Sequence, residues 1–134
     1  NIKKITLNPK KQTKGLHLST IVDEIDIIPL ETTSECLIGE IRKIDIENNL
    51  IYITDPYNGK GVFVFNDKGD FKFKIGREGE GPGEYLIPKD ISIYENELFL
   101  LDVQHSRVNV YNAKNGQFLR QIKMPFTAGL YKNK

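Results

Sequence analysis

Several residue types that carry chemistry are scarce in this chain of 134 residues. Cys36 is the one cysteine, which excludes an intrachain disulfide framework and a metal site built from cysteines. We expect a buried, inert thiol, because nothing near it in the sequence suggests a catalytic histidine partner. No apolar run approaches the roughly 18 residues of a membrane-spanning helix. No signal peptide is visible, and since the chain begins at Asn1, the sequence leaves open whether a targeting segment was removed or left out.

The chain also has no large excess of positive or negative charge. Lys and Arg total 19 against 18 for Asp and Glu, a net charge of +1. A nucleic-acid partner usually leaves a clustered basic footprint, so we expect no such partner. The mild excess of lysine lies at the two ends, within residues 3–14 and 132–134, where we expect solvated tails.

Histidine is too rare for a typical transition-metal site. Zinc or copper usually needs more nitrogen or sulfur ligands than His17 and His105 supply. The chain also lacks a Ser-His-Asp order and the nucleophile elbow of a hydrolase. We therefore expect no catalytic residue, no metal and no cofactor, and a simple loop hydrogen bond for His105.

What the chain does contain is a repeat. Residues 44–75 and 91–122 match at a spacing of 47, including the pairs Ile44/Ile91, Tyr52/Phe99, Asp55/Asp102, Gly69/Gly116 and Ile75/Ile122. The spacing drops to 46 at Val62/Val108 and then returns to 47, so insertions and deletions fall in loops. A repeat of this length with a strand-like pattern and no helical period predicts blades of a β-propeller.

Each copy predicts four strands. The first copy places them at residues 41–46, 50–54, 62–65 and 71–75, and the second at 90–94, 97–101, 108–111 and 118–122. Alternation at Ile25 and Ile27, with Pro29 near the end, predicts a leading edge strand. The expected fold is all-β: two propeller-type blades of four antiparallel strands plus this leading strand.

The repeat also divides the chain. We expect a polar lead-in over 1–20, the leading edge strand and turn over 21–40, and blade 1 over 41–76. A crossing follows over 77–88, then blade 2 over 89–124, then a tail or the start of a third blade over 125–134.

The crossing is rich in glycine, with Gly79, Gly81 and Gly83 close together. A phosphate-binding loop is one interpretation, but a dinucleotide fingerprint opens a helix and a Walker loop needs Gly-Lys-Ser/Thr. Here Pro88 leads into a strand instead. We expect a structural crossing in which glycines permit positive φ and close backbone approach.

The Gly-Pro-Gly-Glu-Tyr motif at residues 81–85 carries a family resemblance. With Ile-Pro-Leu-Glu at 28–31 and Met-Pro-Phe at 124–126, it resembles the six-bladed β-propeller proteins of Bacteroidetes, which are related in blade pattern to NHL-repeat and TolB-like propellers. The resemblance covers about residues 21–126 and implies an exported protein, often lipid-anchored, in the periplasm or at the cell surface. A complete member would have about six blades, of which this chain holds two.

Strand parity decides which loops share a face. In a four-stranded antiparallel blade, the loop between the second and third strands lies at the same end as the crossing to the next blade. That end carries mixed charge, aromatic residues and turn residues, and loops on a rigid scaffold concentrate function. The candidate ligand-facing residues are Tyr57, Asn58, Lys60, Arg77, Glu78, Glu84, Tyr85, Gln104, His105 and Arg107.

Asp55 and Asp102 end equivalent strands. A carboxylate pair for metal binding or acid–base work is one interpretation. We favour the other, in which each aspartate caps its own loop by accepting backbone N–H bonds, because one residue per blade at the same place is what a structural repeat produces. Neighbouring blades also lie about 10 Å apart, too far for a dyad.

Two functions follow from the resemblance and the residues. The first is a non-enzymatic binding or scaffold module that recognises a protein, peptide or glycan. The alternative is a propeller enzyme of lyase or lactonase type with a metal in its central channel. The innermost strands offer a poor ligand set for that metal: Lys43, Asp45, Lys89, Asp90 and Ser92.

Two blades leave a sheet flank on each side, and we expect both flanks to be large apolar surfaces. Such surfaces predict either self-association or a longer parent protein. A ring of three copies would give six blades.

Overall fold

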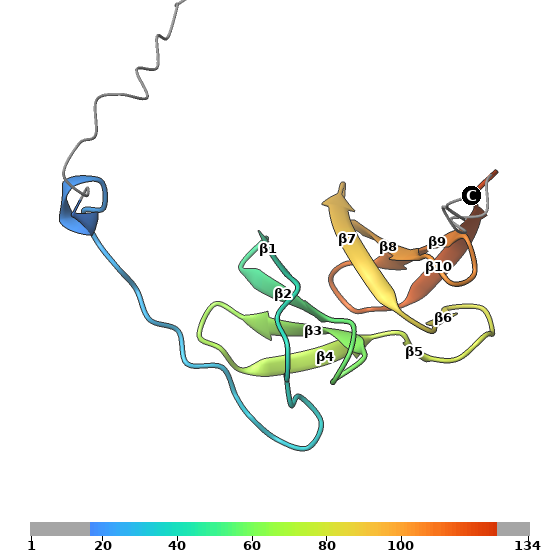
Figure 1. Ribbon diagram of the computed structural model, residues 1–134, viewed down its shortest axis with the longest axis horizontal. Helices are drawn as coiled ribbons and strands as arrows, with labels where there is room; N and C mark the ends of the chain where they lie inside the picture. Colours follow the sequence, from blue (N-terminus) through green and yellow to red (C-terminus); the bar gives the residue numbers. More distant parts are fainter. Residues whose placement is uncertain (1–16, 126–134) are drawn as a thin grey trace, which may run out of the picture.

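The computed structural model describes residues 17–125, which form two four-stranded antiparallel sheets standing side by side (Figure 1). In blade 1 the strands lie in the order β1-β2-β3-β4, and in blade 2 in the order β7-β8-β9-β10. Each strand therefore pairs with the next one along the chain, and each blade is a simple meander. The strands of blade 1 are β1 Lys43–Glu47, β2 Leu50–Asp55, β3 Gly61–Asn66 and β4 Phe71–Ile75. Those of blade 2 are β7 Pro88–Tyr94, β8 Glu97–Asp102, β9 Arg107–Asn112 and β10 Phe118–Lys123.

All eight predicted strands are present, with ends that differ from the prediction by at most two residues. The turns explain the tight meander, because the first turn of each blade holds two successive residues in the left-handed region. Asn48 and Asn49 have φ of 51° and 62°, and Glu95 and Asn96 have φ of 49° and 65°. Two positive φ angles in a row fit the right-handed twist of the strands they join.

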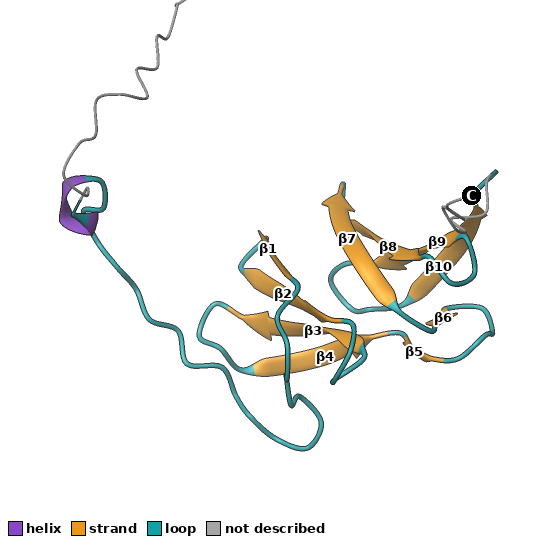
Figure 2. Ribbon diagram, in the orientation of Figure 1, coloured by secondary structure: helices purple, strands orange, loops and turns teal. Residues whose placement is uncertain are grey.

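The leading edge strand is the part of the predicted fold that is wrong. Residues 17–42 contain one 3-10 helix, η1 Leu18–Thr20, and no strand (Figure 2). Ile25 and Ile27, which carry the alternation, are 65% and 88% exposed. The 47-residue offset places residues 22–29 where β4 and its flanks stand in blade 1, at the outer-strand position. A strand there needs a third strand as its partner, and none of the described residues supplies one.

The core between the blades joins one face of each sheet. It is a cluster of buried side chains from both blades and from the crossing: Tyr52, Val62, Val64, Ile75, Tyr85, Ile91, Leu98, Leu100, Tyr111 and Ala113. The Tyr52 hydroxyl donates to the Ala113 carbonyl at 3.0 Å, so the buried polar end of this side chain also joins the blades.

The other face of blade 1 is covered by the chain that precedes it. Leu30, Cys36 and Ile38 pack on a second cluster made of Ile51, Ile53, Phe63 and Phe65, with Phe71 at its edge. The expectation that both sheet flanks are bare is therefore wrong for blade 1, except at Ile44 and Ile46 on β1, which stay exposed. The burial expected for Cys36 is confirmed, since it is 2% exposed.

On the far face of blade 2, none of the residues 17–125 forms such a cover. Tyr94 and Ile122 are 66% and 44% exposed, and Phe99, Leu101 and Val108 are half-buried beside them. Within the described part of the chain, no helix is both long enough and apolar enough to span a bilayer.

Candidate functional site

Asp55 organises the loop that carries the first three candidate residues. Its Oδ1 accepts from the backbone N–H groups of Tyr57 and Asn58 at 3.1 and 2.9 Å. Its Oδ2 accepts from Gly59 at 2.9 Å, and from Gly39 and Glu40 at 2.8 and 3.1 Å. The capping predicted for Asp55 is confirmed, and it extends to the segment that enters blade 1.

These bonds set the charge state of Asp55. Burial alone would raise its pKa, but the backbone N–H donors favour the carboxylate more strongly and hold the pKa at about 2. A fixed negative charge thus holds residues 57–59 and 39–40 in one rigid unit.

The loop held by Asp55 presents exposed side chains next to the crossing. The Lys60 ammonium lies 2.8 Å from Glu78, which belongs to β5 (Arg77–Glu78). The Tyr57 hydroxyl lies 3.5 Å from the ammonium of Lys89, a residue that strand parity did not place in the candidate set. The structure therefore brings Tyr57 and Lys60 to the junction between the blades.

The crossing is more ordered than its glycine content predicts. β5 pairs in parallel with β6 (Glu84–Tyr85), a two-residue bridge that the sequence did not indicate. Glu84 accepts from the Gly81 N–H at 2.9 Å and from Arg77 at 2.6 Å. These two donors, the Gly81 N–H first, lower the pKa of Glu84. Arg77 itself stays exposed, whereas Glu84 is committed to holding the turn.

The prediction that Tyr85 is a ligand-facing residue is wrong. Its side chain is fully buried between the blades, and its hydroxyl donates to the Ile75 carbonyl at 2.6 Å. Burial raises its pKa, so the phenol stays neutral. Strand parity placed Tyr85 at the correct end of the blade but could not give its depth.

Arg107 is also wrong as a ligand-facing residue, since it is only 6% exposed. Its guanidinium donates to the carbonyls of Glu80 and Glu84 at 3.2 and 2.8 Å, and to the side chains of Asp102 and Gln121 at 3.2 Å each. It ties the crossing to blade 2. A planar fork with five donors suits this many acceptors.

Asp102 differs from Asp55, its repeat partner. The prediction that Asp102 accepts backbone N–H bonds from its own loop is wrong. Its Oδ2 lies 2.6 Å from His105 Nδ1 and 3.2 Å from Arg107 Nε. The loop hydrogen bond expected for His105 is thus confirmed. The loop after Asp102 is one residue shorter than the loop after Asp55, and a cation enters β9 where blade 1 has Gly61. The shorter loop was the feature of the sequence that could have indicated side-chain partners for Asp102 in place of backbone N–H donors.

Gln104 is exposed in the same shortened loop. Of the ten candidate residues, the exposed ones are Tyr57, Asn58, Lys60, Arg77, Glu78 and Gln104, and we call them the loop surface.

The innermost strands carry an ion pair at equivalent positions of the two blades. The Lys43 ammonium lies 3.0 Å from Asp90, which is 47 residues further along the chain, and 3.5 Å from Asp45. The bond to Asp90 is the main cause of a raised pKa at Lys43. A cation already pairs with both carboxylates, and residues 17–125 hold no group of three acidic, histidine or cysteine side chains that could bind a metal. These residues do not fit the channel metal of a propeller enzyme.

Comparisons with curated proteins find peptidyl-glycine alpha-amidating monooxygenases. The Xenopus laevis B form is 27% identical over 78 residues, which are 54% of this chain and 9% of that protein. The Mus musculus enzyme is 22% identical over 86 residues, 60% of this chain and 9% of its own length. The chain thus spans about a tenth of these relatives.

A solved structure gives a broader match. A Bacteroides fragilis protein described as exported is 32% identical with a TM-score of 0.71, and the match covers 77% of this chain and 29% of that one. The profile of the 6-bladed beta-propeller family matches residues 1–132. The two four-stranded meanders and this match together show that the chain belongs to the 6-bladed beta-propeller family.

Proposed function

We propose that this chain contributes a non-enzymatic binding surface to an exported six-bladed propeller, and that its partner is a protein, peptide or glycan in the periplasm or at the cell surface. The observation that carries the proposal is the loop surface on a rigid base. Five backbone bonds to Asp55 fix the loop of Tyr57 and Asn58. Such preorganisation lowers the entropy lost on binding.

The chemistry of the loop surface suits polar recognition. It offers an aromatic ring at Tyr57, which is 49% exposed, and an amide at Asn58. Lys60 and Glu78 add charges of both signs. Amphipathic rings with adaptable hydrogen-bonding groups are common in binding surfaces. The similarity to an exported Bacteroides protein supports the location.

The test is a binding screen of the purified chain against peptide and glycan arrays, followed by affinity measurement of each hit. The variant Tyr57→Ala/Lys60→Ala/Glu78→Ala should weaken a true hit at least about tenfold, the loss expected from removing one good polar contact. Tyr94→Ala is the matched control, because Tyr94 is exposed at the opposite end of blade 2. Hits that bind the triple variant as well as the wild type would refute the loop surface.

A propeller enzyme of lyase or lactonase type is the second candidate, and the similarity to peptidyl-glycine alpha-amidating monooxygenases, which are enzymes, is the observation in favour of an enzymatic function. It is tested by incubating the chain with added divalent metals, a glycine-extended peptide and a lactone panel, while bound metal is measured. Turnover with stoichiometric metal would overturn the non-enzymatic proposal.

A further inference from the structure

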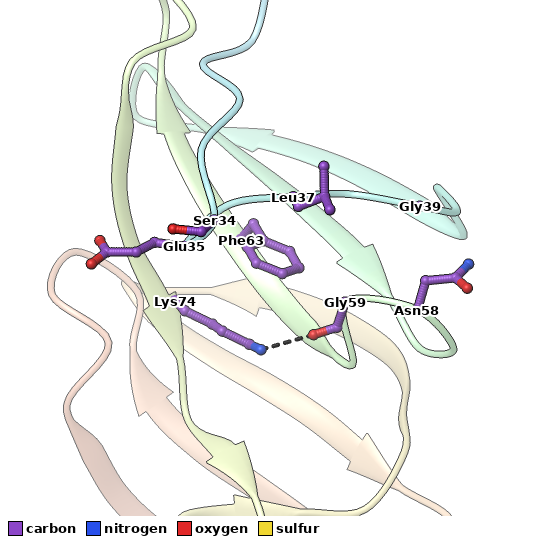
Figure 3. A pocket seen from close by; sticks show the side chains of 8 residues that line it. All are labelled: Ser34, Glu35, Leu37, Gly39, Asn58, Gly59, Phe63 and Lys74. Atoms are coloured by element: carbon purple, nitrogen blue, oxygen red, sulfur yellow. Dashed lines mark hydrogen bonds between the residues drawn. The ribbon is translucent and has the colours of Figure 1, made fainter.

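An open pocket of about 300 Å³ lies on the covered face of blade 1 (Figure 3). Its floor is the buried ring of Phe63, and Lys74 of β4 crosses that floor. Leu37, Ser34 and Glu35 line it from the entering chain, and Asn58 lines it from the loop held by Asp55. The volume is at the small end of the range for ligand sites.

The repeat explains why space is left here. Gly61 and Arg107 hold equivalent positions, since each pairs with the aspartate that ends the preceding strand. In blade 2 the guanidinium of Arg107 fills the space between sheet and crossing. In blade 1 a Cβ added at Gly61 would lie 2.1 Å from Lys74 Cε, so Lys74 uses this space instead.

The two cations differ in how fully they are bonded. Arg107 donates to four acceptors, two of them carbonyls of the crossing. The Lys74 ammonium donates to the Gly59 carbonyl at 2.8 Å and lies 4.9 Å from the centroid of the Phe63 ring. Within residues 17–125 its other two N–H bonds have no protein acceptor. An ammonium that contacts an aromatic ring and has two N–H bonds without a protein acceptor can donate both of them to a bound anion.

No carboxylate of the described residues forms an ion pair with the Lys74 ammonium, although the charges of Glu78 and Asp55 act on it from a distance. Figure 3 shows the Glu35 carboxylate pointing away from the Lys74 ammonium, on the opposite side of Phe63 from Asn58. Burial is the main cause of a lowered pKa at Lys74, and the charges of Glu78 and Asp55 oppose it. Leu37 and Phe63 offer apolar contact beside the ammonium, and the Asn58 amide offers a further donor at the rim.

We propose that this pocket binds a carboxylate carrying a small apolar group, with Lys74 as the residue that recognises the carboxylate. Two sources share this chemistry: a free short-chain carboxylic acid, and the C-terminal residue of a peptide. The proposal goes beyond the loop surface and shares only Asn58 with it. A failure here would leave binding at Tyr57, Lys60 and Glu78 untouched.

The test is an NMR titration of the whole chain that follows the backbone amides of Asn58 and Gly59. The probes are 4-methylpentanoate against 4-methylpentanamide, and acetyl-glycyl-leucine against its C-terminal amide. Each carboxylate that binds should do so at least about tenfold more tightly than its amide, because the amide loses a charge-assisted hydrogen bond. Binding of the peptide acid alone identifies a peptide C-terminus, and binding of the free acid identifies a small metabolite.

Lys74→Met keeps the apolar stem over Phe63 and removes the charge, so it should weaken carboxylate binding about tenfold or more. Lys72→Met on the same strand is the matched control, since Lys72 is exposed like Lys74 but does not line the pocket. If Lys74→Met does not fold, the acid-against-amide comparison on the wild type decides. Equal binding of acid and amide, unchanged binding by Lys74→Met, or no shift with any probe would overturn the proposal.

Discussion

Asp55 and Asp102 show how one repeat position can be used in two ways. Asp55 accepts five backbone N–H bonds, whereas Asp102 binds the side chains of His105 and Arg107. The difference follows from the loops, because the longer loop after Asp55 curls its N–H groups around the carboxylate. The shorter loop after Asp102 cannot do so and supplies cationic or polar side chains instead.

Asp55→Asn should lower the free energy of unfolding by about 2 kcal/mol at pH 7, which is the linkage value of a pKa held at about 2 rather than 3.8. Since the folded pKa is depressed, this stability is present above the unfolded pKa and is lost as the pH falls through the folded pKa. The difference between wild type and variant should therefore shrink to roughly half at pH 3. Urea unfolding at the two pH values measures it.

Asp67→Asn is the control, because Asp67 is exposed in a hairpin turn and its substitution should change stability by less than about 0.5 kcal/mol. An Asp55→Asn loss that is equally large at both pH values would show that shape, and not charge, explains the contribution of Asp55.

Arg107→Met should cost about 3 kcal/mol or more, because it leaves the buried Asp102 carboxylate with one partner and takes a donor from two crossing carbonyls, of which, within the described residues, only that of Glu84 keeps another, from Asn109. Arg77→Met removes an exposed pair with Glu84 and should cost less than about 1 kcal/mol. Denaturant unfolding of both variants makes the comparison. Similar losses for the two would contradict the structural role assigned to Arg107.

At the scale of elements, the crossing depends on one close approach. Gly83 has a φ of 73°, and a Cβ there would lie 2.8 Å from Cγ of Phe118. Its carbonyl accepts from the buried Tyr111 hydroxyl at 3.0 Å, so the backbone cannot shift freely. Left-handed strain and a clash with a ring therefore act on the same residue.

Gly83→Ala should thus destabilise the chain by about 2 kcal/mol or more. Gly81→Ala is the matched control in the same segment, since its Cβ would meet only the end of the flexible Glu84 side chain, at 3.0 Å. Thermal unfolding followed by near-ultraviolet circular dichroism reports on Tyr85 and Tyr111 at the junction. A Gly83→Ala variant as stable as Gly81→Ala would refute the close-packing argument.

The strands were predictable because alternation and turn residues are local signals. The leading strand failed because a strand requires a partner, and the alternation at Ile25 and Ile27 says nothing of where the partner is. The burial of Tyr85 and Arg107 could not be predicted either. Arg107 is buried because the carbonyls of the crossing need donors, and Tyr85 because it packs between the blades with its hydroxyl on the Ile75 carbonyl of β4. Both requirements appear only once the crossing is folded between the two blades.

At the scale of the whole molecule, the repeat lets each free flank be compared with the internal junction. Blade 1 presents Tyr52, Val62 and Ile75 to blade 2, and all three are buried. Their repeat partners on the far face of blade 2 are Phe99, Val108 and Ile122, which are partly or largely exposed.

Charged side chains cover part of the far face of blade 2. The positions equivalent to Leu50 and Phe73 are Glu97 and Arg120, which form a two-bond ion pair at 2.6 and 2.7 Å. Strand register places Val110 between them, and Val110 is fully buried. The remaining apolar strip around Ile122 has no cover among the described residues, and such strips mark interaction surfaces.

We expect the chain to self-associate through this strip, with the blade 1 flank of a second copy as the acceptor. Ile44 and Ile46 are 49% and 69% exposed there, while their repeat partners at the internal junction lie in or against the core. Sedimentation velocity should therefore show assembly that grows with concentration, and a heterologous contact of this kind closes a ring at three copies.

Ile122→Glu should shift the chain to monomer at concentrations where the wild type assembles, because it buries an unpaired charge in the contact. Leu119→Glu on the same strand is the control: Leu119 is 42% exposed, but it lies in the register shift of β10, outside the strip. A wild type that stays monomeric at every concentration would refute self-association. Equal loss of assembly in the two variants would place the contact elsewhere on the outer strand.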